Sequence, residues 1–190
     1  MKKILIFLVV IVAIFAIAFY FYTSRADSPT ELTLPESQTE TGEDSSFRPN
    51  PSNATFIFND GALTLLSGKN ERQLTPGSAF TEETILLDKF AYSDLNGDGK
   101  TDTILLLARY GAGSGTFIYI AGYISGPVTY RGTRALFVGD RISPQSLTIG
   151  AGGVINFEYL DRSPDEPLAA EPTVRVSKQF VFSSGELRER

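Results

Sequence analysis

Residues 93–107 read SDLNGDGKTDTILLL, a polar loop that leads without a break into an apolar segment. Residues 104–107 are apolar at four successive positions, so this segment is apolar on both faces if it forms a β-strand. Residues 117–120, FIYI, have the same character. Strands of this kind are covered on both faces, which is typical of the middle of a sheet. The sequence therefore predicts that an acidic loop opens directly into the centre of a β-sheet.

The rest of the chain after residue 53 also has the pattern of a β protein. Residues 55–66, TFIFNDGALTLL, place two apolar runs around an Asn-Asp-Gly turn, which favours a tight hairpin. In VINFEYL, residues 154–160, apolar and polar side chains alternate as in a half-buried strand. Further apolar runs are separated by turns rich in Gly, Pro and Asp. We predict an all-β domain over residues 53–190, a mostly antiparallel sheet or sandwich.

The N-terminus has the pattern of a transmembrane helix. Lys2 and Lys3 precede an uncharged run of 19 residues at 4–22. As a helix this run would span about 28 Å, close to the thickness of the hydrocarbon core of a bilayer. Only Arg25 follows closely, so the positive-inside rule places the N-terminus in the cytoplasm and the domain outside the cell membrane. Residues 1–26 are therefore predicted to be a single-pass membrane anchor.

A cleaved signal peptide is the alternative for the same segment. Ser24 and Ala26 provide small residues for a cleavage site before Asp27, and cleavage would give a secreted protein. The apolar region of a signal peptide usually has about 7–15 residues, so this longer run favours the anchor. The chain has no cysteine, so lipid attachment to a cysteine is excluded.

Residues 27–52 have the composition of a tether between the anchor and the domain. They contain six acids, one base and four prolines, with many Ser and Thr residues. Such a segment has little apolar surface to bury, so we expect it to be extended and disordered.

The composition also excludes several classes of function. The chain has no histidine and no cysteine, which removes Ser/His and Cys/His catalysis and the usual zinc ligands. Its net charge is −5 and its pI about 4.8, with scattered basic residues, so no nucleic-acid partner is predicted.

The acidic loop has the ligand pattern of a calcium site. Asp94, Asn96, Asp98 and Asp102 supply side-chain oxygens at positions one, three, five and nine, and position six is a glycine that permits a sharp turn. At position seven, the backbone carbonyl of Lys100 can serve as a ligand while its side chain points away. Calcium in proteins is bound by about six to eight oxygen ligands of this kind, so we predict a structural Ca²⁺ site. The alternative is a polar turn without metal.

The loop departs from an EF-hand, because position twelve is Leu105 instead of a glutamate. Its pattern DxNxDGxxD, followed by a strand, resembles the calcium loops of FG-GAP repeats, the integrin-type β-propeller motif. In that motif the aspartate at position nine closes the site. A propeller needs typically four to eight blades and this loop occurs once, so the resemblance implies the loop but not a full propeller.

The wider chain resembles a group of uncharacterised exported bacterial proteins. The shared segments are DLNGDG at 94–99, GSGTF at 113–117, a GDRI and PQ pair within 139–145, and Y-x-D-R-x-P at 159–164. This resemblance implies a recurring domain and carries no established activity.

Two further acid–base pairs, Asp140 with Arg141 and Asp161 with Arg162, suggest turn structure more than a ligand site. Taken together, the sequence predicts a membrane-anchored extracytoplasmic β domain that binds calcium and has a non-catalytic binding or scaffolding role. Its partner would be an envelope protein or a glycan. The alternatives are a hydrolase that uses carboxylates such as Asp161 and Asp165, and a secreted binding module.

Overall fold

The computed structural model describes residues 47–77, 79–111, 113 and 115–190, and these residues form an all-β fold with antiparallel strand pairs. The strands are β1 (Thr55–Phe58), β2 (Gly61–Thr64), β3 (Lys69–Gln73), β4 (Thr81–Ser93), β5 (Asp102–Tyr110), β6 (Thr116–Ile124), β7 (Arg131–Gly132), β8 (Leu136–Asp140), β9 (Ser143–Ile149), β10 (Ile155–Asp161), β11 (Val174–Ser183) and β12 (Glu186–Glu189). A single 3-10 turn, η1 (Ala151–Gly153), lies among them. The all-β prediction is confirmed, and the described strands form no closed propeller.

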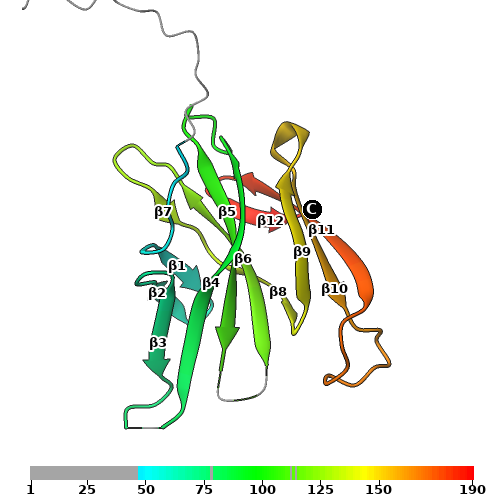
Figure 1. Cartoon of the computed structure of the whole chain (residues 1–190). Helices are drawn as coiled ribbons and strands as arrows, with labels where there is room; N and C mark the ends of the chain where they lie inside the picture. Colours follow the sequence, from blue (N-terminus) through cyan, green and yellow to red (C-terminus); the bar gives the residue numbers. More distant parts are fainter. Residues whose placement is uncertain (1–46, 78, 112, 114) are drawn as a thin grey trace, which may run out of the picture. The chain divides into compact units, whose positions relative to one another are not determined.

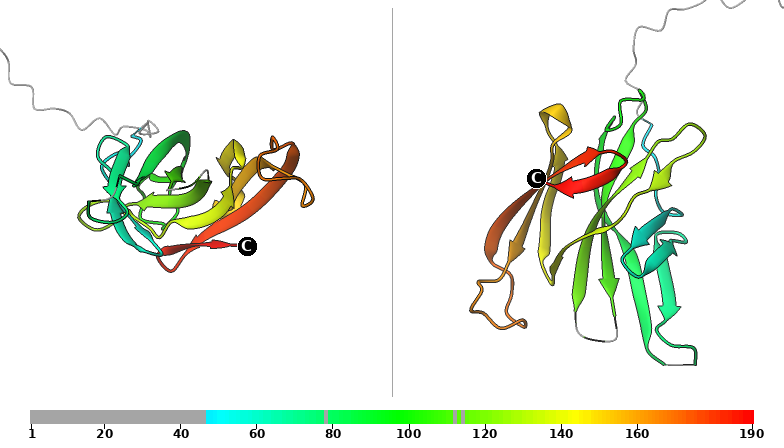
Figure 2. Two further views of the ribbon diagram at one scale, coloured as in Figure 1. Left: turned by 90° about the horizontal axis from the view of Figure 1, so that it is seen from below. Right: turned by 180° about the vertical axis from the view of Figure 1, so that it is seen from behind.

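The described strands are arranged in three layers. The central sheet has the order β3-β4-β5-β6-β7, with β8 also paired to β6. On one side of it lies the four-stranded sheet β12-β11-β10-β9, and on the other lies the two-stranded hairpin β1-β2 (Figures 1 and 2). The central sheet is therefore covered on both faces.

Strand β5 is the centre of this arrangement. Ile104 and Leu106 belong to the core cluster shared with Phe157 of β10, whereas Leu105 packs in a second cluster with Phe56 of β1. These four side chains of β5 and β10 are fully buried, as is Phe56. The prediction that this segment is apolar on both faces because it lies mid-sheet is thus confirmed.

Two local predictions are also confirmed. The hairpin register pairs Phe58 with Gly61, so the turn contains Asn59 and Asp60, and Gly61 has a φ of 128°. A positive φ is readily available only to glycine among common residues, which explains its place at this turn. In β10 every second side chain is buried, as the alternation in the sequence indicates.

An arginine joins the hairpin to the central sheet at the far end of β5. Arg109, of which only 7% is exposed, donates from Nη1 to Asp60 Oδ1 at 2.9 Å and forms an ion pair with Glu82 of β4. The bond from Arg109 holds the pKa of Asp60 well below its usual range, and the same bond raises the pKa of Arg109. Arg72 of β3 also contacts Asp60, from the exposed side. We call these four residues the Arg109 cluster.

The fold begins before the boundary at residue 53 that the sequence suggests. Pro49 is buried, and its carbonyl accepts a hydrogen bond from Thr103 Oγ1 at 3.2 Å. The guanidinium of Arg48 lies 5.0 Å from the centre of the Tyr92 ring. Residues 47–52, which composition alone assigns to the tether, therefore contact the domain, because two prolines and an aromatic residue provide apolar surface among the polar ones.

The predicted anchor at residues 1–26 and the tether up to residue 46 lie outside the described residues. Within the part of the chain that the structure describes, no helix is long and apolar enough to cross a membrane.

Candidate metal centre

The acidic loop, residues 94–101, joins β4 to β5 at one end of the central sheet (Figure 1). Two of its residues have left-handed backbone conformation: Gly97, with a φ of 78°, and Gly99, with a φ of 80°. Gly99 is the glycine at position six of the predicted calcium loop, and its φ supports the sharp turn expected there.

Asp94 organises the interior of this loop. Its Oδ1 accepts a hydrogen bond from the Gly97 N–H at 2.7 Å, and its Oδ2 accepts one from the Gly99 N–H at 2.8 Å. Asn96 Oδ1 and Asp98 Oδ1 each accept a bond from the N–H two residues further on, both at 2.9 Å. The sequence segment therefore folds as successive Asx turns, in which short polar side chains satisfy the loop backbone.

Asp102 is the most buried member of the set, with no exposed surface. Its Oδ2 accepts the Leu95 N–H at 2.9 Å, and its Oδ1 accepts the Ser125 N–H at 2.8 Å. Among the residues that the structure describes, no lysine or arginine forms an ion pair with Asp102. A buried carboxylate without a cationic partner is costly, although donors of hydrogen bonds lower that cost.

Ser125 connects the loop to the end of β6, a role that no motif in the sequence predicts. Its hydroxyl oxygen lies 2.8 Å from both Asp98 Oδ2 and Asp102 Oδ1, while Asn96 Nδ2 donates to the Ser125 carbonyl at 2.9 Å. A hydroxyl has a single hydrogen, so it cannot donate fully to two carboxylates. The hydroxyl therefore donates to one carboxylate at a time, while Asp102 Oδ1 also accepts the Ser125 N–H.

The side chain of Lys100 takes a different direction from the one that the sequence predicts. Its side chain does not point away from the loop: Nζ lies 3.9 Å from Asp98 Oδ2 and donates to the Gly126 carbonyl at 3.3 Å. The attraction of the ammonium to the Asp98 carboxylate and its hydrogen bond to the Gly126 carbonyl account for this position. The side chain is half exposed, so it neutralises the loop only in part.

The electrostatics of the loop reflect this excess of negative charge. Three carboxylates and one ammonium give residues 94–102 a net charge of −2. The hydrogen bond from Ser125 lowers the pKa of Asp98, so this carboxylate is ionised at neutral pH. Burial, followed by the charges of Asp102 and Asp98, raises the pKa of Tyr130, whose hydroxyl donates to the Thr101 carbonyl at 3.0 Å.

The loop has the chemistry of a cation site, but its geometry fits a cation only in part. The donor set consists of carboxylate, amide and backbone oxygens, which are the ligands that calcium prefers. The geometry is less complete: no three acidic, histidine or cysteine side chains of the described residues are grouped closely enough to hold an ion. Asp98 and Asp102 converge on Ser125, whereas Asp94 is turned toward the loop backbone. The five predicted ligand residues are thus brought into one loop but are not gathered around one point.

The acid–base pairs near β8 and β10 serve turn structure, as the sequence suggests. Asp140 Oδ1 accepts the Thr116 N–H at 2.9 Å, and Arg162 donates to the carbonyls of Asp140 and Arg141 at 2.6 and 3.1 Å. Asp161 Oδ1 accepts the N–H of Arg162 at 2.8 Å.

Comparison with known proteins identifies no relative of this chain. No protein-family model matches the chain, and no curated protein or solved structure is significantly similar to it. The likeness of the loop to FG-GAP calcium loops therefore stays a prediction from its residues, as does the wider resemblance to exported bacterial proteins.

Proposed function

We propose that residues 94–102 bind calcium and that the domain is a non-catalytic binding module held outside the cell by its N-terminal anchor. The observation that carries the calcium proposal is Asp102, which is fully buried, has no cationic partner among the described residues, and shares one hydroxyl with Asp98. A divalent cation would supply the missing positive charge.

The ligands in this proposal are the side chains of Asp94, Asn96, Asp98 and Asp102 and the carbonyl of Lys100. Each carboxylate oxygen has two lone pairs, so an oxygen that already accepts a backbone N–H can still bind a cation. Bound calcium would neutralise the charge of −2 on the loop and lock the start of β5 to Ser125. Its role would be structural, because the chain has no histidine or cysteine to perform the common forms of catalysis beside it.

The extracytoplasmic location rests on the apolar run at 4–22 and its flanking lysines. Fractionation followed by N-terminal sequencing tests it. The proposal predicts an intact N-terminus in the membrane fraction, whereas a soluble chain that begins at Asp27 would establish the secreted alternative.

Thermal melting tests the calcium proposal. The wild-type domain should melt at a higher temperature in calcium than in chelator, and magnesium should substitute poorly because it prefers a smaller octahedral shell. Asp98→Asn keeps the size and one oxygen of the side chain, so it should lose most of the calcium response and fold normally. Identical melting of the wild type in calcium and in chelator would exclude the site.

A further inference from the structure

One end of the central sheet holds both the metal loop and the point where the chain enters the domain. The antiparallel registers of β4, β5, β6 and β7 bring the loop 94–101 and the loop 125–130 to the same end of the sheet. Phe47, the first residue that the structure describes, contacts Tyr130 of the second loop, with ring centroids 6.3 Å apart. We call residues 47–50, 94–102 and 125–131 the entry end of the domain (Figure 1).

The entry end exposes apolar and aromatic side chains. Val128, in the middle of the loop 125–130, is 95% exposed, the largest exposed fraction of any large hydrophobic side chain in the described part of the chain. Phe47 is also exposed. The rings of Tyr123 and Tyr130, both half-buried, stack with centroids 5.3 Å apart. Tyrosine side chains beside apolar ones are typical of surfaces that lie at the boundary between a membrane and water.

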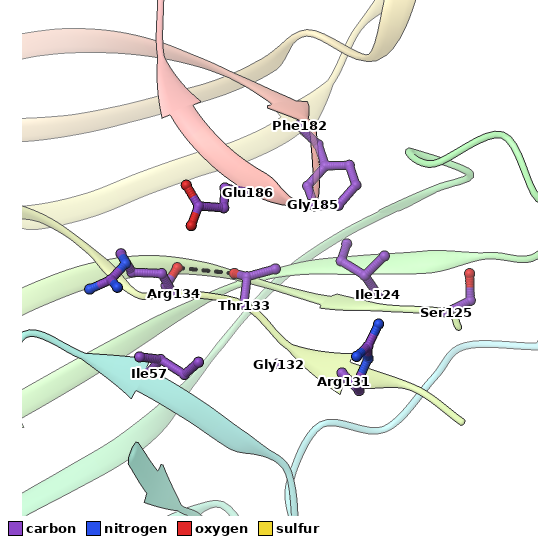
Figure 3. Close-up of a pocket in the computed structure, with 10 residues that line it drawn as sticks. All are labelled: Ile57, Ile124, Ser125, Arg131, Gly132, Thr133, Arg134, Phe182, Gly185 and Glu186. Atoms are coloured by element: carbon purple, nitrogen blue, oxygen red, sulfur yellow. Dashed lines mark hydrogen bonds between the residues drawn. The ribbon is translucent and has the colours of Figure 1, made fainter. Parts of the chain in front are cut away.

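Three basic side chains accompany these residues. Arg48 and Arg131 are exposed, and neither forms an ion pair with a described carboxylate. Lys100 is half exposed, and its Nζ donates to the Gly126 carbonyl. The Arg131 guanidinium lies near the same residue, since a Cβ added to Gly126 would be 3.8 Å from Arg131 Nε. Figure 3 shows the Arg131 side chain toward the same end of β6 and β7 as Ser125.

The net charge of the entry end depends on the metal. Its three bases and the three carboxylates of the metal loop cancel, so the net charge is zero without a cation and +2 with one calcium ion bound. A positively charged surface attracts anionic lipid headgroups. Without the cation, the ionised carboxylates of Asp94 and Asp98 oppose that attraction. Calcium in the loop would therefore strengthen any contact of this end with an anionic membrane.

The position of Phe47 decides which end of the domain the proposed anchor can bring to the membrane. Residues 23–46 separate the apolar run from Phe47. A flexible chain of about 24 residues has a root-mean-square end-to-end distance on the order of 30 Å. Because the segment joins the domain at the entry end, this end can reach the lipid surface without the segment having to cross the domain. Such a short connection gives a high local concentration of lipid, so a weak attraction is enough for contact.

We propose that the entry end docks onto the surface of the membrane that holds the N-terminal anchor, and that it binds anionic lipid headgroups there. Val128 and Phe47 lie among the headgroups, and Arg48, Lys100 and Arg131 pair with lipid phosphates. The exposed apolar residues favour a lipid surface over a soluble anion, and the bases favour anionic over neutral lipids. A second copy of the chain is disfavoured, because two entry ends with bound calcium repel each other. This proposal rests on the anchor and the calcium site proposed above.

Fluorescence of the full chain in lipid vesicles tests the proposal, because the sequence has no tryptophan and a single one can be introduced as a reporter. Val128→Trp places the reporter at the entry end. Leu168→Trp is the matched control, because Leu168 is also exposed and lies in the loop between β10 and β11, at the opposite end of the domain (Figure 1). Each variant is reconstituted into vesicles of phosphatidylglycerol and phosphatidylcholine, with and without brominated acyl chains that quench tryptophan.

In calcium, brominated lipid should quench the fluorescence of Val128→Trp by about half and leave that of Leu168→Trp nearly unchanged. Chelation of calcium, or vesicles of phosphatidylcholine alone, should reduce the quenching. Adding Arg131→Gln to Val128→Trp should lower the ratio of docked to free domain about fivefold. Arg175→Gln, which removes an exposed arginine of β11, should not change that ratio.

Three results would overturn the proposal: no quenching of Val128→Trp, equal quenching of Leu168→Trp, or equal quenching in neutral vesicles. Flotation of the vesicles, and melting curves with calcium and with chelator, are measured on the same samples. A chain that floats with the vesicles and responds to calcium but shows no quenching rejects the docking alone. A chain that does not float rejects the anchor, and one whose melting ignores calcium rejects the metal site.

Discussion

The two ends of strand β5 differ in how buried negative charge is balanced. At one end, Arg109 places a guanidinium between Asp60 and Glu82, so the acids of the Arg109 cluster have a cation built into the fold. At the other end, Asp102 is more deeply buried and receives only hydrogen bonds from neutral donors. An acidic cluster that carries its own arginine is complete as folded, whereas one without a cation has the charge to bind a metal.

The largest expected effect comes from removing the cation at the Arg109 end. Arg109→Met leaves Glu82, whose side chain is 12% exposed, and Asp60 without their main partner, and should lower the free energy of unfolding by roughly 3 kcal/mol. Chemical denaturation measures the loss. Arg72→Met, which removes a more exposed arginine from the same cluster, is the matched control and should cost less than about 1 kcal/mol. Equal losses in the two variants would show that burial does not distinguish these arginines.

Calcium should have a smaller effect at the other end of β5. For a dissociation constant of about 10⁻⁴ M and calcium at about 2 mM, binding to the folded state adds about 1.8 kcal/mol. Removing calcium should then lower the melting temperature by roughly 4–8 °C. Asp98→Asn in metal-free buffer should be at least as stable as the wild type, because it removes one of the charges that repel each other. If the variant is clearly less stable without metal, Asp98 acts through its bond to Ser125 instead.

Acid should weaken the Arg109 end through Asp60. The pKa of Asp60 is lowered in the folded state by its bond to Arg109, so the unfolded chain binds a proton more readily. The stabilisation is present above the unfolded pKa of about 3.9 and is lost as the pH falls below that value. Denaturation between about pH 2.5 and 7 should show a steeper acid loss for the wild type than for Arg109→Met. Parallel curves would assign the acid sensitivity to other carboxylates.

The smallest effect is expected from the segment before the domain. Deleting residues 28–46 should leave the melting temperature nearly unchanged, because their composition is that of a spacer. Extending the deletion to residue 50 also removes Arg48 and Pro49, which contact Tyr92 and Thr103, and should lower it by several degrees. A large drop with the shorter deletion would mean that the acidic segment also stabilises the domain.

The sequence predicted those features that depend on local pattern. Four successive apolar residues at 104–107 identified a strand buried on both faces, and the alternation in residues 154–160 identified the buried face of β10. The Asn-Asp-Gly turn identified the first hairpin. Each of these signals lies within one element, so side-chain periodicity and turn chemistry are enough to recognise it.

The features that the sequence did not reveal depend on pairing between distant segments. Ser125 is 23 residues from Asp102 and has no motif of its own; the antiparallel register of β5 with β6 brings the two together. Arg109 reads as one polar residue in an apolar strand, and its role depends on Asp60, 49 residues away. The position of the Lys100 side chain likewise follows from the charges that surround it in the folded loop.

Titration of calcium into the metal-stripped domain, followed by calorimetry, tests the contrast between the two ends of β5 most directly. We expect one binding site per chain in the wild type, near-complete loss of binding in Asp98→Ala, and unchanged binding in Arg109→Met at a temperature where that variant is folded. Absence of any binding at millimolar calcium, or binding that survives Asp98→Ala, would contradict it, and Asp102 would then be a buried carboxylate held by hydrogen bonds alone.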